Sequence, residues 1–245
     1  MTAPLLEISG LGKRFGGFVA LDGIDLAVGA GERIGLIGPN GSGKSTLVNC
    51  ICGTLTNEIG TVRFNGESLK GLQAHQRTHR GLARSFQLPR PFTSLTVAGN
   101  LRVPLVYTVN ARPGTHLSHA EIDARCAELL QLVGLADKAE HYSRDLTQVE
   151  MRKLELARAL AADPKLLIAD ESMAGLSQAE VADIVALLID LNKRGITIIL
   201  IEHIMRAVMS FSQRLVVLVS GKKIADGDPD VVIRNPEVER AYLGV

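Results

Sequence analysis

The stretch GLIGPNGSGKST, Gly35–Thr46, contains four glycines and one lysine directly after a short apolar run. It matches the pattern G-x-x-x-x-G-K-[ST] through Gly38, Gly43, Lys44 and Ser45. Glycines let consecutive backbone N–H groups curve around a phosphate, and the start of a helix adds partial positive charge there. The stretch therefore predicts a phosphate-binding loop.

The segments on either side of the loop support this prediction. Arg33–Ile37 reads as a short apolar strand, and residues 45–53 read as a helix closed by Gly53. A flexible turn with an exposed lysine would lack this context, so we interpret the loop as a nucleoside triphosphate site. Lys44 is predicted to reach the β and γ phosphates, and the Ser45 hydroxyl to coordinate Mg²⁺. The predicted nucleotide contacts are Gly38, Asn40, Gly41, Ser42, Gly43, Lys44, Ser45 and Thr46.

Polar residues follow two further apolar runs, LLIADE and ITIILIEH, at the ends of predicted strands. Asp170 is predicted to hold Mg²⁺ through water, and Glu171 to polarise the attacking water as general base. The alternative is an acidic pair that only faces solvent. His203 lies at the same edge of the sheet and is predicted to hydrogen-bond the γ phosphate, the alternative being a structural histidine.

Composition limits the other function classes. The chain has 245 residues, of which 46% are hydrophobic and 22% charged, so we expect one globular domain with a subdomain. The net charge of +1 gives no overall basic field for nucleic acid or anionic lipid. The three cysteines, Cys50, Cys52 and Cys126, fit no zinc spacing and indicate a reduced cytosol. Because no apolar run is long enough to cross a membrane, any spanning segment must come from another chain.

The pattern of apolar residues changes along the chain. The first hundred residues read as β-rich, with strands near 5–9 and 21–28 and a hairpin signalled by Asn-Gly in TVRFNGESL. Helical spacing dominates from Thr96 to Ala162, with a capping box at Ser118 and Glu121. Beyond Asp163, nearly continuous apolar strands alternate with helices, which predicts a parallel sheet covered on both faces.

Together these features resemble the ATP-binding subunit of ABC transporters. The further matching stretches are KRFGG (13–17), RSFQ (84–87), LTQVEMRKLELARAL (146–160) and AGLS (174–177), with His203 as the switch histidine. The resemblance implies that Phe15 stacks on adenine, although a core phenylalanine is the alternative. It also implies that Gln87 contacts Mg²⁺ and water and reports the nucleotide state to a membrane partner.

The resemblance also implies a fold and an activity. We expect an α/β P-loop NTPase fold, RecA-like, with a mostly parallel sheet covered by helices, an N-terminal antiparallel β subdomain and a helical insertion. Residues 1–95 and 163–245 would form the nucleotide-binding core, and residues 96–162 the helical subdomain. The expected activity is hydrolysis of ATP to ADP and phosphate, coupled to transmembrane transport, with ATP and Mg²⁺ bound.

Within this family, three stretches look like the ATPases of branched-chain amino acid importers: GLARSFQLPRPFTSLTVAGNL (81–101), ESMAGLS (171–177) and NPEVERAYLG (235–244). Relatives with the same appearance handle urea or aromatic acids, so these solutes stay open. The implied partners are a second ABC ATPase, integral membrane permeases and, indirectly, a solute-binding protein, with no nucleic acid. The implied location is peripheral, on the cytoplasmic face of the inner membrane.

The signature sequence departs from the family pattern. Where the family has Leu-Ser-Gly-Gly-Gln, this chain has Leu146, Thr147, Gln148, Val149 and Glu150. In the family, two ATPases pair head to tail and each signature helix points its N-terminus at the γ phosphate held by the other. Thr147, Gln148 and Val149 are the predicted signature contacts. Thr147 can still cap the helix, but two glycines are replaced and Glu150 would bring negative charge towards phosphate.

We therefore expect a weak signature face and, more readily than a homodimer, a heterodimer with an ATPase of regular signature. The site built from Lys44, Glu171 and His203 would then hydrolyse faster. The alternative is that backbone N–H groups and the helix dipole bind phosphate regardless of these side chains.

Two competing classes fit the sequence less well. A GTPase would show Asn-Lys-x-Asp, and NKRG at Asn192–Gly195 lacks the aspartate. A nucleic-acid-bound ABC ATPase would have two cassettes or long coiled-coil arms. The basic cluster Arg77, Arg80, Arg84 and Arg90 is instead interpreted as a solvated or interface face. In the segment from Gln87 to Thr96, LPRPF is interpreted as a surface for a membrane partner, with an ordinary turn as the alternative.

Overall fold

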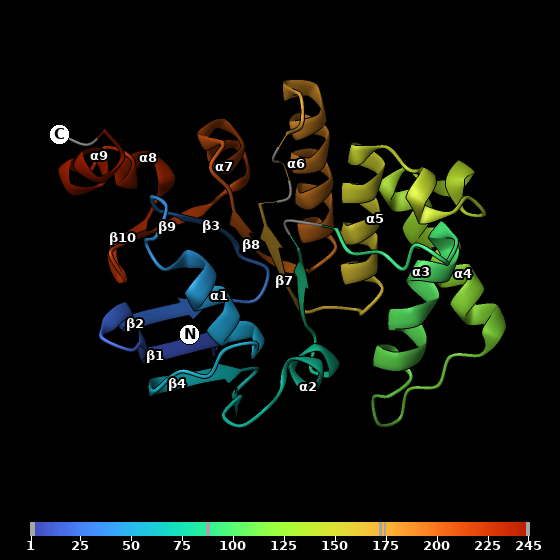
Figure 1. Ribbon diagram of the computed structural model, residues 1–245, viewed down its shortest axis with the longest axis horizontal. Coiled ribbons are helices and arrows are strands. Elements are labelled where there is room, and N and C mark those ends of the chain that lie inside the picture. The colour runs from blue at the N-terminus through green and yellow to red at the C-terminus, as the bar shows by residue number, and fades with distance from the viewer. Residues whose placement is uncertain (1–2, 87–88, 172, 174, 244–245) are drawn as a thin grey trace.

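Two β-sheets pack on either side of the helix that follows the glycine loop (Figure 1). The computed structural model describes residues 3–86, 89–171, 173 and 175–243. The larger sheet has the strand order β10-β9-β3-β8-β7-β6. Its strands are β3 (Arg33–Ile37), β6 (Leu82–Ser85), β7 (Leu166–Asp170), β8 (Thr197–Ile201), β9 (Arg214–Val219) and β10 (Lys222–Gly227).

Five of these strands run parallel, and β10 pairs with β9 in the antiparallel sense. The predicted α/β fold with a mostly parallel sheet is therefore confirmed. In a parallel array all strands end at the same edge, where ligands of open α/β sheets bind. The glycine loop follows β3, Asp170 ends β7, and His203 comes two residues after the end of β8. Sheet topology thus brings three separate predicted site segments to one edge.

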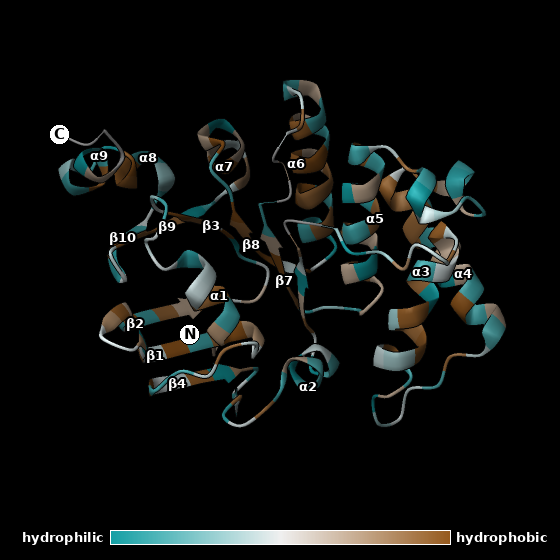
Figure 2. Ribbon diagram, in the orientation of Figure 1, coloured by the Kyte–Doolittle hydropathy of each residue, from teal (hydrophilic) through white to brown (hydrophobic). Residues whose placement is uncertain are grey.

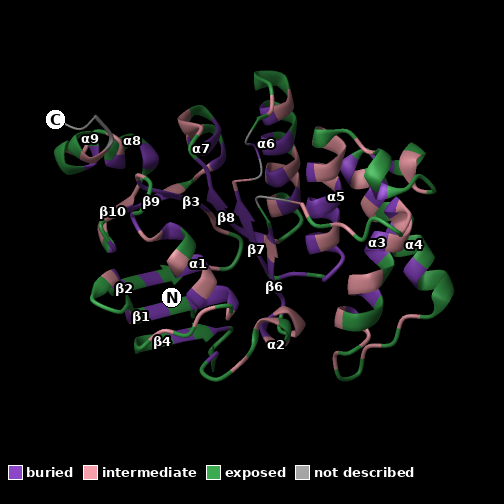
Figure 3. Ribbon diagram, viewed as in Figure 1, coloured by how far each residue is buried: buried purple, intermediate pink, exposed green. Residues whose placement is uncertain are grey.

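The central strands of the larger sheet are hydrophobic and buried (Figures 2 and 3). In β7, Leu167 and Ala169 belong to the core shared with the helical region, whereas Leu166 and Ile168 pack in the core under the antiparallel sheet. This is the period of two that a strand imposes on its side chains. Because both faces are covered, the strands read as continuous apolar runs, as expected for a parallel sheet.

The smaller sheet is antiparallel, with the order β2-β1-β4-β5. The β4–β5 hairpin turns at Asn65 and Gly66, whose φ angles are 50° and 79°. Both central residues of a type I′ turn need positive φ, which explains the Asn-Gly signal. The predicted hairpin is therefore confirmed. The strands are β1 (Leu6–Phe15), β2 (Phe18–Val28), β4 (Ile59–Phe64) and β5 (Glu67–Ser68).

Helices dominate the segment between β6 and β7. The capping box predicted at Ser118 and Glu121 is present, with each side chain bonded to the backbone N–H of the other residue. The boundaries at 95/96 and 162/163 stay a prediction. The elements of this segment are α3 (Val97–Pro104), the π-helix η1 (Leu105–Val109), α4 (His119–Val133), the 3₁₀ turns η2 (Ala136–Lys138) and η3 (Ser143–Asp145), and α5 (Gln148–Leu160).

The remaining helices cover the larger sheet. Figure 1 shows α6 and α7 on one face and α1 with the smaller sheet on the other. Gly53 is the C-cap of α1, as predicted, and Cys50 and Cys52 of this helix are buried and free. Among the described residues, no helix is long and apolar enough to cross a membrane. These helices are α1 (Lys44–Cys52), α2 (Ala74–His79), α6 (Gln178–Lys193), α7 (Met205–Phe211), α8 (Pro229–Val232) and α9 (Pro236–Leu243).

The basic cluster is not one solvated face, so that interpretation was wrong for Arg77 and Arg84. Arg77 is buried and its guanidinium donates to the carbonyls of Cys50 and Ile51 at the end of α1. Burial lowers the pKa of Arg77, and the carbonyl end of the helix dipole offsets part of that cost. Arg84 points into the sheet edge near Asp170. Arg80 and Arg90 are both exposed, as expected.

Candidate functional site

Two glycines of the loop are required by close backbone packing. A Cβ on Gly38 would lie 2.1 Å from the carbonyl oxygen of Leu218, and one on Gly43 would lie 2.8 Å from that of Ala20. A Cβ on Gly41 would meet nothing within 4 Å. The loop is therefore pressed against β9 and β2 on its inner side and open at Gly41, where a ligand can approach the backbone.

Lys44 is held on the inner side of the loop, only 6% exposed. Its Nζ donates to the carbonyls of Gly38, at 2.7 Å, and Pro39, at 3.1 Å. Burial lowers the pKa of Lys44, and the charges of Glu171 and Asp170 act in the opposite direction. The lysine is thus placed between the loop and the acidic pair before any phosphate is bound.

A cavity of about 240 Å³ opens beside the loop. Phe15, Phe18, Glu171 and residues of the loop line it. Phe15 is 47% exposed, which excludes the alternative of a core phenylalanine. Phe18 is 63% exposed and pairs with Phe15 across the β1–β2 turn. It was not among the site residues predicted from the sequence. Its signal was the sequence RFGGF, which puts two aromatic rings on either side of a Gly-Gly turn.

The acidic pair and the histidine meet at the sheet edge. Asp170 is buried, and Glu171 has a φ of 45°, in the left-handed region that non-glycine residues avoid. Such a conformation costs on the order of 1–3 kcal/mol and persists where its surroundings fix it, most often at functional sites. The Glu171 N–H donates to the Ile201 carbonyl at 2.9 Å, and Glu171 Oε1 lies 2.7 Å from His203 Nε2. Two residues predicted from separate strands are therefore in direct contact.

The donors available to a metal suit Mg²⁺. Ser45 and Asp170 line a shared cavity of about 570 Å³. Among the residues that the structure describes, no cluster of three or more His, Cys, Asp or Glu could enclose a metal. A site with one hydroxyl, one carboxylate and open space fits an ion that keeps several waters and takes phosphate oxygens. Gln87, predicted to join them, lies outside the described residues.

Comparison with known proteins identifies the family. The model described as ABC transporter matches residues 21–174. The chain belongs to the ABC transporter ATP-binding family. A second model, described as Branched-chain amino acid ATP-binding cassette transporter, matches residues 222–245 of this ABC chain. As a member of the family, the chain is an ATPase, and it binds ATP.

Whole-chain relatives agree with this ABC assignment. BraF of Pseudomonas aeruginosa, a high-affinity branched-chain amino acid transport ATP-binding protein, is 37% identical over 253 residues, covering 100% of this chain and 99% of BraF. The ADP conformation of MJ1267, an ATP-binding cassette of an ABC transporter, has a TM-score of 0.86 at 29% identity, with 100% of both chains covered. MJ0796, a dimeric cassette in a post-hydrolysis state with ADP and Pi, has a TM-score of 0.81 at 25% identity, covering 91% of this chain and 98% of that chain.

The ABC signature in this chain is capped internally. Thr147 is the N-cap of α5, and its hydroxyl accepts from Glu150 N at 3.3 Å. Glu150 Oε2 accepts from Thr147 N at 2.8 Å, and the other oxygen lies 3.6 Å from Lys138 Nζ. The expected cap by Thr147 is confirmed. The Glu150 carboxylate, however, turns back onto its own helix instead of extending outward, because the helix N-terminus attracts it.

Two charged residues near the candidate nucleotide site were not predicted from the sequence to belong to it. Arg84 contacts Asp170, and Glu202, 3% exposed, accepts the Met173 N–H at 2.8 Å. Burial raises the pKa of Glu202. The available signal for both was position, since Arg84 lies near the end of β6 and Glu202 directly follows β8.

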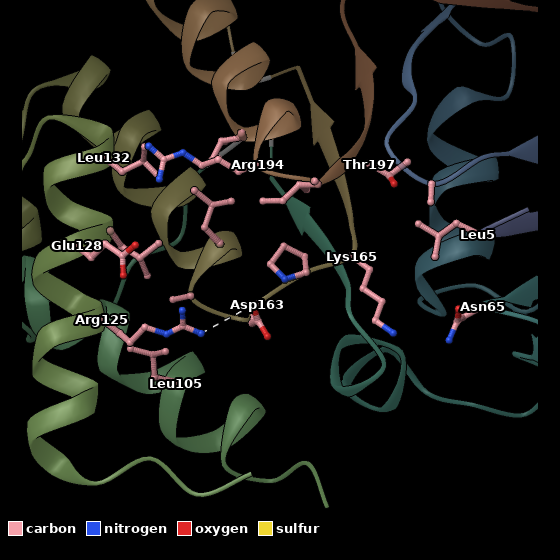
Figure 4. Close-up of a pocket in the computed structure, with 18 residues that line it drawn as sticks. Leu5, Asn65, Leu105, Arg125, Glu128, Leu132, Asp163, Lys165, Arg194 and Thr197 are labelled. Atoms are coloured by element: carbon pink, nitrogen blue, oxygen red, sulfur yellow. Dashed lines mark ion pairs between the residues drawn. The ribbon is translucent and has the colours of Figure 1, made fainter. Parts of the chain in front are cut away.

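A separate cavity of about 490 Å³ opens at the opposite end of β7 and β8 (Figure 4). Lys165 and Thr197, at the starts of these strands, line it together with Arg194. Arg125 lies 3.9 Å from Asp163 at its wall. Asp170 is at the other end of β7, so this cavity lies at the opposite edge of the sheet from the candidate nucleotide site. None of the predicted site residues lines it.

Proposed function

We propose that the chain is the ATP-hydrolysing subunit of an ABC importer for amino acids, with branched-chain amino acids as the first candidates. The observation that carries the proposal is the meeting of the glycine loop, the acidic pair and His203 at one sheet edge. The likeness to BraF and the match at residues 222–245 support the solute class. Urea and aromatic acids are the alternative cargo.

The nucleotide would be held by the open side of the loop. Phe15 stacks on adenine, and the backbone N–H groups around Gly41 face the phosphates. Lys44 exchanges its two carbonyl partners for phosphate oxygens. When bound, Mg²⁺ offsets the charge of the phosphate oxygens, and we assign Ser45, Asp170 and Gln87 to hold it.

Glu171 and His203 would carry out the hydrolytic step. Glu171 is positioned by its strained backbone and by contact with His203, so its carboxylate has a fixed direction. With ATP bound, His203 hydrogen-bonds the γ phosphate and Glu171 accepts the proton of the attacking water. The water oxygen forms the new bond to phosphorus as the bond to ADP breaks.

ATP would close two ABC subunits around two nucleotides, because each nucleotide is completed by the signature of the other subunit. The internal cap of α5 by Glu150 supports a weak signature face in this chain. We therefore propose a heterodimer in which the partner ATPase supplies the stronger signature. Residues 96–162 would carry the closing motion as one subdomain.

The permease would dock next to residues 87–96, at the cytoplasmic face of the inner membrane. Phe92 is exposed there, with the Arg158 guanidinium 5.2 Å from its ring centroid. Arg90, Arg158 and Phe86 line the adjoining cavity. An apolar segment with acidic residues from a membrane subunit would fit this surface. A periplasmic solute-binding protein would act only through the permease.

Calorimetry with Mg·ATP tests the nucleotide assignment directly. Lys44→Ala should weaken binding by about 10- to 100-fold, the loss expected for a hydrogen bond to a charged group. Lys165→Ala is the matched control, because Lys165 lines the cavity at the opposite edge of the sheet. This variant should bind Mg·ATP as tightly as the wild type does. Equal affinity for the wild type and Lys44→Ala would contradict the assignment.

The solute class needs the assembled transporter. Reconstituted with its permeases, the wild type should drive ATP-dependent uptake of labelled leucine, and Glu171→Gln should not. Uptake of urea or an aromatic acid, without uptake of leucine, would contradict the proposed solute class. Salt-sensitive binding to duplex DNA with no membrane partner would instead favour a nucleic-acid ABC ATPase.

A further inference from the structure

The guanidinium of Arg84 is hydrogen-bonded to Asp170, the carboxylate of the proposed metal site. Asp170 Oδ2 accepts hydrogen bonds from two nitrogens of Arg84, Nε at 3.2 Å and Nη2. The third nitrogen, Nη1, donates to Asn49 Oδ1 at 2.7 Å. Asn49 lies on α1, one turn after Ser45, and all four residues line the same cavity. Arg84 is therefore tied to both walls of the space that joins the hydroxyl of Ser45 to Asp170.

Burial makes this pair strong. The Arg84 side chain is only 14% exposed and that of Asp170 is 8% exposed. Water screens such a pair weakly, and burial of a carboxylate without a partner is strongly unfavourable. Arg84 thus supplies the charge that Asp170 needs while no cation of another kind is present.

The guanidinium of Arg84 and a Mg²⁺ ion would compete for the carboxylate of Asp170. A Mg²⁺ bound to Asp170 would stand within a few ångströms of the guanidinium, where like charges repel strongly. Free Mg²⁺ would have to displace Arg84 without help. Mg²⁺ that enters with ATP brings phosphate charge, which can offset the repulsion and provide new acceptors for the guanidinium.

We propose that Arg84 is a tethered counter-cation of the metal site, which holds Asp170 in the nucleotide-free protein and lets the site accept Mg·nucleotide in preference to free Mg²⁺. This inference rests on the proposed role of Asp170. Arg84 is here a positioning residue, since it pairs with Asp170 and does not itself take part in the hydrolysis of ATP.

Release of Arg84 would also alter the docking surface. Its guanidinium carbon lies 5.2 Å from the centroid of the Phe86 ring, which is half exposed and lines two neighbouring cavities. When Asp170 changes partner, Arg84 is free to move over this ring. The nucleotide state would thus change the charge beside the surface assigned to the permease.

The test measures metal binding without nucleotide, using Mn²⁺ as a paramagnetic substitute for Mg²⁺ and electron paramagnetic resonance to count free Mn²⁺. The wild type should bind Mn²⁺ weakly, and Arg84→Met should bind it at least about tenfold more tightly, because one competing charge is removed. Arg84→Lys keeps a charge but offers a single nitrogen, so it should lie between the two and provides a second variant.

Two controls fix the location of the effect. Arg90→Met removes another arginine that lines the same cavity but is exposed to solvent, and it should leave Mn²⁺ affinity unchanged. Adding Asp170→Asn to Arg84→Met should abolish the gain. A gain that survives this second substitution would place the metal elsewhere and overturn the inference.

The inference and the proposed function fail in different ways. If the wild type binds ADP but Arg84→Met and Arg84→Lys bind free Mn²⁺ no better than it does, only the role of Arg84 is lost. If the wild type binds neither ADP nor ATP, the nucleotide site itself is wrong.

Discussion

The loop glycines serve different physical purposes although they stand close together. Gly38 and Gly43 leave room for the backbones of neighbouring strands, and Gly41 leaves the outer surface open. The motif correctly predicted a nucleotide as the ligand, but it did not indicate which glycines are required by packing against neighbouring strands. That division depends on β2 and β9, which approach the loop from distant parts of the chain.

Alanine substitutions should separate these purposes. Gly41→Ala should lower the free energy of unfolding by about 1 kcal/mol, the cost of a left-handed φ for a residue with a Cβ. Gly38→Ala should lower it by about 3 kcal/mol or more, because its Cβ would overlap the Leu218 carbonyl. Urea unfolding without nucleotide measures both values. Equal losses would show that the close contact at Gly38 relaxes freely.

Helix ends were predictable because their signals are local. The capping box of α4 and the closure of α1 by Gly53 follow from residues a few positions apart. The cap of α5 was also expected, but the direction of Glu150 was not. A carboxylate at this position can face a partner's phosphate or its own helix, and the nearby N–H of Thr147 and Lys138 decide for the helix.

Glu150 should give α5 a pH-dependent contribution to stability. The backbone hydrogen bond from Thr147 is the largest cause that holds the pKa of Glu150 below its ordinary value of 4.5. Its charge therefore stabilises the folded chain above that value, and the gain is lost as pH falls through the lower folded pKa.

Glu150→Ala should cost about 1 kcal/mol in urea unfolding at pH 7. Glu150→Gln is the control, since glutamine keeps the capping box without the charge. The gap between the wild type and Glu150→Gln should shrink from pH 7 to pH 3. A gap of constant size would mean that the charge has no part in the cap.

At the scale of the whole molecule, the site exists because parallel strands end together. The glycine loop, Glu171 and His203 are far apart in sequence, yet the order β3-β8-β7 makes their strands neighbours. In the proposed assembly a second ABC subunit would complete each site. The capped signature of this chain would then make the two sites unequal.

This inequality predicts which base matters in the assembled pair. Glu171→Gln in this chain should lower the ATPase rate of the heterodimer by about tenfold or more, the share of a general base at the faster site. The same substitution in the partner ATPase should remove only a minor share. Replacing Gln148 and Val149 by glycine should make the two effects similar. A minor loss from Glu171→Gln would contradict the asymmetry.

The amino-acid sequence alone determined the phosphate loop, the strand-ending acids, the Asn-Gly hairpin and the helix caps, since each depends on residues a few positions apart. Tertiary structure alone decided the partners of Arg77 and Arg84. Arg84 reaches Asp170 across 86 positions because β6 is placed beside β7, and Arg77 reaches the end of α1. A charged side chain looks the same in a sequence whether water or a buried carboxylate surrounds it. Only the packing of distant elements removes the water and so fixes what that charge does.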